Sequence, residues 1–189
     1  MTAVRLRAAF VAASIAWAVV LVAVPFAASQ PHVSAMTAAL IAGVYAVGSL
    51  VCHQLPERSY HLWSAQMPVC ARCAGIYFGA VLGASARALR TAQAVRHSRK
   101  VAQHSPKVAQ HSPKVAQGFS PANAVAPTVS PAWRARIALA VAAAPTVISL
   151  VYEWTTGDAP SHAIRAATGV PIGVVVAWLV VAATDNQVN

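Results

Sequence analysis

The sequence is poor in charged residues: Asp, Glu, Lys and Arg together make up only 10% of its 189 residues. Soluble globular proteins carry about a quarter charged residues, because their surfaces face water. Apolar residues account for 58% of the chain, so a water-exposed exterior cannot be built from this composition. The shortage of charge therefore excludes a soluble globular protein and predicts an integral membrane protein whose main partner is the lipid bilayer.

Several catalytic patterns are also missing, and each absence removes a class of enzyme. The sequence has no glycine-rich loop that would cradle phosphates, no Ser/His/Asp arrangement on a suitable scaffold and no pair of carboxylates near its cysteines. Cysteine itself is scarce, and all three cysteines lie between residues 52 and 73. The sequence therefore names no reaction, and its distinctive chemistry is concentrated in one short segment.

Acidic residues are few, with only four against fourteen Lys and Arg, which gives a formal net charge of +10. Nine of the fourteen cations fall within 87–136, so the positive charge is local. A basic segment beside a membrane is attracted to anionic lipid headgroups, and this explanation requires no nucleic acid. We predict contact of the 87–136 loop with anionic lipids and no specific nucleic-acid partner.

Five apolar stretches come close to the length of about 20 residues that a helix needs to cross the hydrocarbon core. They are 8–28, 34–51, 68–88, 137–152 and 163–183. The predicted fold is all-α: a polytopic membrane protein with about five transmembrane helices and a disordered basic loop. Its segments are a first helix in 1–33, two helices that bracket the cysteines in 34–90, a linker in 91–132 and two helices in 133–189. The first stretch also resembles a cleaved secretory signal, but its length favours a retained helix.

The linker contains a heptapeptide repeat, Lys-Val-Ala-Gln-His-Ser-Pro, which starts at Lys100 and Lys107 and begins again at Lys114. A proline every seven residues breaks a helix, and the repeat has no apolar seam of the kind that forms a coiled coil. The repeat is therefore predicted to be a disordered tether between membrane helices.

The basic residues give conflicting orientations if there are five spans. Arg5 and Arg7 favour a cytoplasmic position for the start of the chain, whereas the 87–136 loop would then lie on the opposite side of the bilayer. Because the loop carries more charge, we place it in the cytoplasm and the cysteines on the outer side. An error of one in the number of spans would reverse this inference.

Small residues recur every four positions in two of the apolar stretches. They are Gly75, Gly79 and Gly83 in the third, and Gly169, Gly173 and Ala177 in the fifth. Helices in lipid associate through such faces, because small residues let two backbones approach closely. The third and fifth helices are therefore predicted to pack together, with Arg165 directed toward the third helix.

The segment 52–73 contains candidate metal ligands. Cys70 and Cys73 form a Cys-x-x-Cys chelate, and the gap back to Cys52 is in the range that separates the two halves of many zinc sites. One imidazole would complete a tetrahedral site, and both His53 and His61 are candidates, since adjacent residues such as Cys52 and His53 rarely bind the same ion. These ligands favour zinc, although Cu(I) and iron–sulfur centres use similar thiolates.

The same cysteines also suit redox chemistry. Pro68 fits the first turn of a helix, so Cys70 and Cys73 are expected near the N-terminus of the third span. The helix dipole and Arg72 both lower the pKa of a thiol there, which suits a metal ligand and a reactive dithiol equally. The alternative to a metal-binding protein is therefore a membrane thiol-disulfide oxidoreductase that uses Cys70 and Cys73.

Three arginines, Arg58, Arg72 and Arg165, are expected at the same membrane face as the cysteines. Together they would form a positive pocket for a phosphate or carboxylate, because arginine binds such groups through two parallel hydrogen bonds. Each arginine taken singly also fits simple snorkelling to the interface. A small transporter or lipid-binding protein is the third interpretation.

The motifs of this region resemble those of a known family. They are Cys52-His53-Gln54, Pro56-Glu57-Arg58-Ser59, Pro68-Val69-Cys70-Ala71-Arg72-Cys73 and Gly75-Ile76-Tyr77, with a return at Arg165, Thr168-Gly169 and Gly173. On these residues the sequence resembles the uncharacterised prokaryotic membrane-protein family called domain of unknown function 2085 (DUF2085). Ala74 stands where the family often has threonine, and the lysine-bearing repeat has no counterpart there. The resemblance implies a small multi-pass protein of the prokaryotic cell membrane and implies neither a reaction nor a metal.

Overall fold

The computed structural model describes residues 3–104 and 131–186. These residues form long helices and one small hairpin. In chain order the elements are α1 (Ala3–Ala28), α2 (Ala35–Val51), the 3-10 turn η1 (Pro56–Arg58), β1 (Ser59–Leu62), β2 (Ala65–Cys70), α3 (Ala71–His104), α4 (Pro131–Thr156) and α5 (His162–Asn186). The predicted helical membrane fold is confirmed, and the hairpin is an addition to it.

The lengths and surfaces of the helices fit a lipid environment. In the described part of the chain, α1, α4 and α5 are long and apolar enough to cross a membrane. Large apolar side chains such as Leu50 and Ile148 are exposed, as expected for helices that face lipid. α2 is apolar but has 17 residues, which gives about 26 Å of helix against roughly 30 Å of hydrocarbon.

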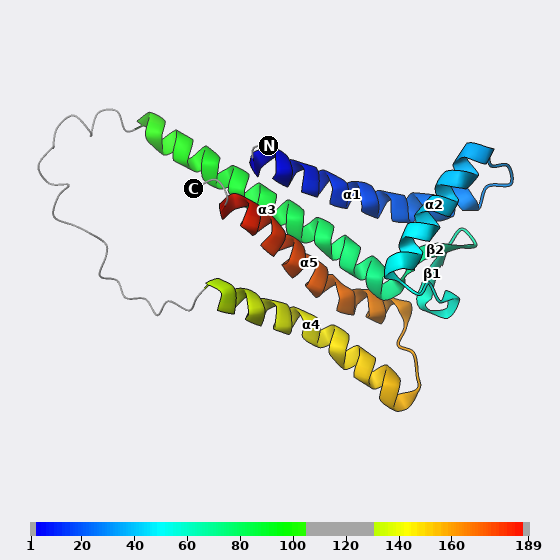
Figure 1. The fold of residues 1–189 in the computed structure, drawn as a ribbon. Helices are drawn as coiled ribbons and strands as arrows, with labels where there is room; N and C mark the ends of the chain where they lie inside the picture. Colours follow the sequence, from blue (N-terminus) through cyan, green and yellow to red (C-terminus); the bar gives the residue numbers. More distant parts are fainter. Residues whose placement is uncertain (1–2, 105–130, 187–189) are drawn as a thin grey trace, which may run out of the picture.

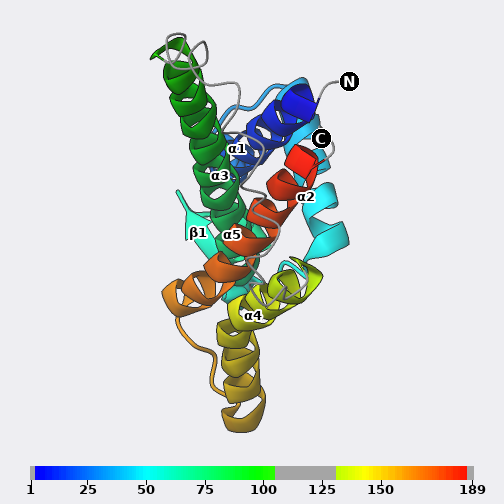
Figure 2. The same cartoon turned by 90° about the vertical axis from the view of Figure 1, so that its left-hand side faces the viewer.

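The arrangement of the helices separates two ends of the molecule. α1, α3 and α5 lie side by side, and α4 packs against α5 (Figure 1 and Figure 2). α1 and α4 run toward the hairpin, whereas α3 and α5 run away from it (Figure 1). α2 lies across the hairpin end instead of running beside these helices, and it contacts β2 and the end of α1. The described residues therefore form four helices along the bundle and one across its end.

The packing of α3 against α5 confirms the prediction from the small residues. A Cβ atom added at Gly75, Gly79 or Gly83 would collide with a backbone carbonyl oxygen of α5, and one added at Gly169 or Gly173 would collide with a carbonyl oxygen of α3. The two backbones therefore touch along several turns, as close packing in lipid requires. Ala177 continues this face and is 1% exposed.

The hairpin corrects the expectation that Pro68 begins a helix. Pro68 lies in β2, α3 begins at Ala71, and Cys70 is therefore the last residue of a strand. β1 and β2 are antiparallel and are joined through Trp63 and Ser64, whose φ angles are 51° and 67°. Two consecutive residues with positive φ are typical of the tight turn that matches the twist of a hairpin.

α3 is longer than predicted, and this changes the boundary of the linker. The helix continues to His104, so residues 91–104 are helical and do not belong to a disordered tether. This stretch is rich in alanine, arginine and glutamine, which favour helices, and its first proline comes only at residue 106. The remainder of the predicted linker up to residue 130 lies outside the described residues.

Candidate metal centre

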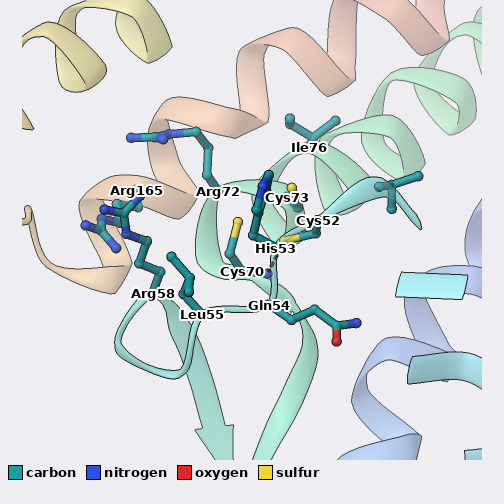
Figure 3. A pocket seen from close by; sticks show the side chains of 11 residues that line it. Cys52, His53, Gln54, Leu55, Arg58, Cys70, Arg72, Cys73, Ile76 and Arg165 are labelled. Carbon is teal, nitrogen blue, oxygen red and sulfur yellow. Dashed lines mark hydrogen bonds between the residues drawn. The ribbon is translucent and has the colours of Figure 1, made fainter. Parts of the chain in front are cut away.

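The three cysteines come together at the hairpin end, each from a different element. Cys52 caps the C-terminus of α2, Cys70 ends β2, and Cys73 lies in the first turn of α3. Their three Sγ atoms all lie within 4.8 Å of one another. Figure 3 shows the sulfur atoms grouped beside the pocket. The predicted approach of Cys52 to the Cys-x-x-Cys pair is therefore present in the structure.

A network of amide hydrogen bonds fixes the chain on either side of Cys52. Gln54 has a φ of 50°, and its Nε2 donates to the carbonyl oxygens of Tyr45 (2.9 Å) and Pro68 (2.6 Å). Gln66 Nε2 donates in turn to the Gln54 carbonyl oxygen at 2.6 Å. Gly48 lets α2 approach this network, because a Cβ there would collide with the Pro68 carbonyl oxygen. The Gln54 side chain thus connects α2 to β2 and holds Cys52 beside Cys70.

The surroundings of the Cys70 sulfur atom favour a negatively charged thiolate. The backbone N–H of Cys70 donates to Cys52 Sγ at 3.2 Å, the interaction drawn as a dashed line in Figure 3. A hydrogen bond with the Cys73 side chain lowers the pKa of the Cys70 thiol to about 5, although burial acts in the opposite direction. The N-terminus of α3 adds the positive end of a helix dipole.

The floor of the cysteine cluster is apolar and comes partly from α1. Leu21 is fully buried against it, and the ring of Trp17 packs edge-on against Tyr77 of α3 with centroids 6.0 Å apart. The first helix therefore forms part of the core beneath the site.

The two candidate histidines differ in position. His53 lines the same pocket as the three cysteines, and its ring is drawn beside them in Figure 3. His61 lies on β1 with an exposed side chain and is not among the residues that line this pocket. Neither ring nitrogen joins the group of three sulfur atoms. The geometry therefore favours His53 over His61 as a fourth ligand.

The three predicted arginines do converge, and a carboxylate that sequence reasoning missed lies between them. Glu153 of α4 is 7% exposed and accepts from Arg165 Nη2 at 2.9 Å. Arg58 Nη2 lies 3.1 Å from the same Oε1 atom, and Arg72 Nη2 lies 3.6 Å from Oε2. Glu153 follows the predicted apolar stretch 137–152 directly. A single carboxylate at the end of a membrane helix, in a chain with surplus arginine, was the signal that could have identified it.

Two further contacts bring the arginines and Glu153 together. His162 Nε2 at the start of α5 is hydrogen-bonded to the Glu57 carbonyl oxygen at 3.2 Å, which ties η1 to α5. Thr146 Oγ1 donates to the Thr168 carbonyl oxygen at 2.7 Å, which ties α4 to α5. Both contacts set the positions of elements that carry the charged side chains.

Cysteines and arginines share one cavity of about 380 Å³. Its lining comprises Val51, Cys52, His53, Gln54, Leu55, Arg58, Cys70, Arg72, Cys73, Ile76 and Arg165. The cavity therefore joins a soft, sulfur-rich wall to a positively charged wall. Such a site can hold a thiophilic metal ion, an anionic group or both.

These features define a multi-helix membrane protein with a cysteine, histidine and arginine pocket at one end of its helices. Residues 52–105 match the family described as "Predicted membrane protein (DUF2085)", which confirms the resemblance over this stretch. The matched stretch contains the three cysteines, His53 and two of the three cavity arginines, Arg58 and Arg72. It ends before Glu153 and Arg165.

A relative in Methanocaldococcus jannaschii, an uncharacterized protein, is 55% identical over 40 residues. This alignment covers 21% of the present chain and 26% of the relative, so the chain spans about a quarter of the relative's length. No solved structure matches. The comparisons therefore support the membrane assignment and the cysteine-containing segment and name no activity.

Proposed function

We propose that this membrane protein binds a zinc ion through the Sγ atoms of Cys52, Cys70 and Cys73, with His53 as the fourth ligand. The observation that carries the proposal is the grouping of three Sγ atoms within 4.8 Å, from residues up to 21 positions apart in the sequence. In a tetrahedral site with zinc–sulfur bonds of about 2.3 Å, neighbouring sulfur atoms lie about 3.8 Å apart. The present arrangement needs only a small contraction to reach that geometry.

The donor set favours zinc over harder cations. Three thiolates and an imidazole are soft or intermediate ligands, whereas magnesium and calcium require several oxygen ligands. Glu153 is the one buried carboxylate among the described residues near the cavity, and arginines surround it. His53 has an exposed side chain, so its ring can turn toward the sulfur atoms without disturbing the core.

Metal content of the purified full-length protein tests the proposal. We expect about one equivalent of zinc in detergent-purified wild type, and loss of this zinc on Cys73→Ser. His53→Ala should lower zinc affinity, and His61→Ala is the matched control that should leave it unchanged. Cobalt substitution gives a second readout, because thiolate-to-cobalt charge transfer reports the number of sulfur ligands. A metal-free wild-type protein would refute the proposal.

The second candidate is a thiol-disulfide oxidoreductase. It is favoured by the free, partly exposed Cys70 and Cys73, which face the cavity as neighbours in a Cys-x-x-Cys motif. A thiol count on the same sample separates the two functions. A reversible disulfide between Cys70 and Cys73 in protein without metal would support the oxidoreductase, whereas three metal-protected thiols would support the zinc site.

A further inference from the structure

The arginine wall of the cavity carries more positive charge than the described acidic residues neutralise. Arg58, Arg72 and Arg165 contribute three guanidinium groups, and Glu153 is the only carboxylate that pairs with them among the described residues. The surplus is therefore two positive charges. Arg165 is 3% exposed, so part of this surplus is removed from water. An unbalanced charge in such a place is costly unless another anion joins it.

The hydrogen bonds of the arginines are also incomplete. Arg72 Nη2 donates to Ser149 Oγ at 3.0 Å, and Arg165 Nη2 donates to Glu153. The Nε atoms of Arg72 and Arg165 are buried and have no hydrogen-bond partner within the described parts of the chain. Buried guanidinium donors without acceptors cost free energy. A ligand with several acceptor oxygens would satisfy them.

The cavity beside these donors has the dimensions and lining of a ligand site. Its volume of about 380 Å³ exceeds the space needed for one anionic group. Val51, Leu55 and Ile76 add apolar surface, so the ligand can carry an apolar part next to its charged group. A phosphate monoester has a charge of about −1.5 to −2 at neutral pH and three acceptor oxygens, which matches both the surplus charge and the free donors.

We propose that this cavity binds a phosphate monoester group through Arg58, Arg72 and Arg165. The group can belong to a small soluble phosphate or to the headgroup of a lipid such as phosphatidic acid. Both present the same chemistry to the guanidinium groups. The proposal goes beyond the zinc site and does not depend on it, because the arginines and the cysteines are different ligands on different walls of the cavity.

Binding of two phosphate probes to the full-length protein tests this proposal. Titration calorimetry in phosphate-free detergent solution measures the affinity for inorganic phosphate, and native mass spectrometry of nanodisc samples compares retention of phosphatidic acid with phosphatidylcholine. Arg58→Gln is the informative variant, since Arg58 lies at the rim, 46% exposed, and its loss should spare the fold. We expect its phosphate affinity to fall at least tenfold.

Arg136→Gln is the control for this experiment. It removes the same charge from an exposed position at the start of α4, at the opposite end of the molecule. Its phosphate affinity should stay within twofold of wild type. Binding of inorganic phosphate would identify a soluble ligand. Selective retention of phosphatidic acid that Arg58→Gln lowers and Arg136→Gln does not would identify a lipid in the cavity, as distinct from anionic lipid held by the basic 87–136 region. Absence of both, or equal losses in the two variants, would overturn the proposal.

A second inference concerns orientation and rests on the distribution of cations between the two ends. Arg5 and Arg7 begin α1, the later part of α3 carries Arg87 to Lys100, and Arg134 begins α4, all at the end away from the hairpin (Figure 1). Eleven of the fourteen Lys and Arg fall in residues 5–7 or 87–136. The other three are the arginines of the cavity.

Aromatic residues mark the membrane boundaries at both ends. Arg87 and Arg90 lie over the ring of Trp178, 5.3 and 5.0 Å from its centroid, as side chains at an interface do. Trp133 and Trp154 are 55% and 80% exposed. They are 21 positions apart on α4, which corresponds to about 32 Å, close to the thickness of the hydrocarbon core.

We infer that the basic end is cytoplasmic and that the cysteine and arginine cavity opens on the outer side. Because α2 lies across the hairpin end, the start of α1, the distal part of α3 and the start of α4 are on the same side, and their charges no longer give conflicting orientations. Four described helices lie along the bundle instead of the five expected from the sequence, which removes the conflict and leaves the cysteines on the outer side.

Two reporters, each with one cysteine added to the three native ones, test the orientation in intact cells. Ala159→Cys lies in the exposed connection from α4 to α5 at the hairpin end, and Gln93→Cys is exposed on the distal part of α3. A membrane-impermeant maleimide should label the first before permeabilisation and the second only afterwards, with wild type as the background for the native cysteines. The opposite pattern, or labelling of both from outside, would refute this orientation.

Discussion

Replacement of Gly79 by alanine tests the contact between α3 and α5 most directly. A Cβ atom at this position would collide with the Val170 carbonyl oxygen and would lie 3.0 and 3.1 Å from the carbonyl carbon and Cα of the same residue. All three are backbone atoms, so no side-chain rotation can relieve the contact. The helices must separate or shift, and overpacking of this kind costs about 1–3 kcal/mol.

Gly43→Ala provides the matched control. Gly43 also lies inside a helix, α2, but nothing is within 4 Å of the position of its added Cβ. Both substitutions gain the same helix propensity, about 0.5–1 kcal/mol. The difference in unfolding free energy between the two variants therefore isolates the overpacking cost, expected at about 1–3 kcal/mol. Gly43→Ala should be neutral or stabilising, and Gly79→Ala destabilising.

Unfolding in detergent, followed by the loss of helical circular dichroism with increasing SDS, measures this difference. Size-exclusion chromatography of each variant before unfolding shows whether the folded state is still reached. If Gly79→Ala were as stable as Gly43→Ala, the close backbone contact between α3 and α5 would be wrong. The assignment of these helices to the membrane does not depend on this result.

Three further substitutions test the hairpin end. Glu153→Gln should destabilise the protein by about 3–5 kcal/mol because it leaves buried arginines unpaired, whereas the exposed Asp158→Asn should change stability by less than about 0.5 kcal/mol in the same unfolding assay. Gly48→Ala should displace Gln54 and the strand that holds Pro68, which would lower zinc affinity at unchanged helix content by circular dichroism. Ser64→Gly should raise the unfolding free energy by about 0.5–1 kcal/mol, since Ser64 has a φ of 67° that glycine adopts without strain; equal or lower stability would contradict this account of the turn.

The parts of the fold that follow from local pattern could be predicted from the sequence. The lengths of the apolar stretches predicted the helices. The four-residue spacing of Gly75, Gly79 and Gly83 predicted which face of α3 packs and that its partner is α5. The approach of Cys52 to Cys70 also followed from spacing and ligand chemistry. Each of these predictions depends only on the type of residue and its spacing in the sequence. Both can be read without knowledge of the fold.

Features that depend on distant backbone atoms could not be predicted. The strand at Pro68 is held by the Gln54 side-chain amide, which donates to carbonyl oxygens in α2 and β2. No sequence pattern predicts these hydrogen bonds. The direction of α2 likewise depends on its contact with β2, because its apolar composition fits a crossing helix and a helix at the membrane surface equally. The choice of His53 over His61 required the path of the chain through the positive φ of Gln54.

Glu153, which the sequence analysis missed, illustrates a different difficulty. Glu153 lies at the end of an apolar helix, where a charged residue usually indicates only that the helix has reached water. Its function in the structure depends on Arg58 and Arg165, which come from other parts of the chain. Only the fold shows that these charges meet.

The charge on the cysteine wall of the cavity should affect phosphate binding to the arginine wall. At neutral pH the zinc-free cysteines carry a charge of about −1, because the pKa of the Cys70 thiol is lowered to about 5. Three thiolates and one neutral imidazole around a zinc ion also carry −1, so zinc should change the surplus charge of the cavity little. Phosphate should therefore bind the zinc-free and the zinc-loaded protein with similar affinity, and by thermodynamic reciprocity it should change zinc affinity little. Titration of inorganic phosphate into both forms measures the ratio of the two affinities; weaker binding to the zinc form would contradict this charge balance, and tighter binding would show that phosphate replaces His53 as a ligand.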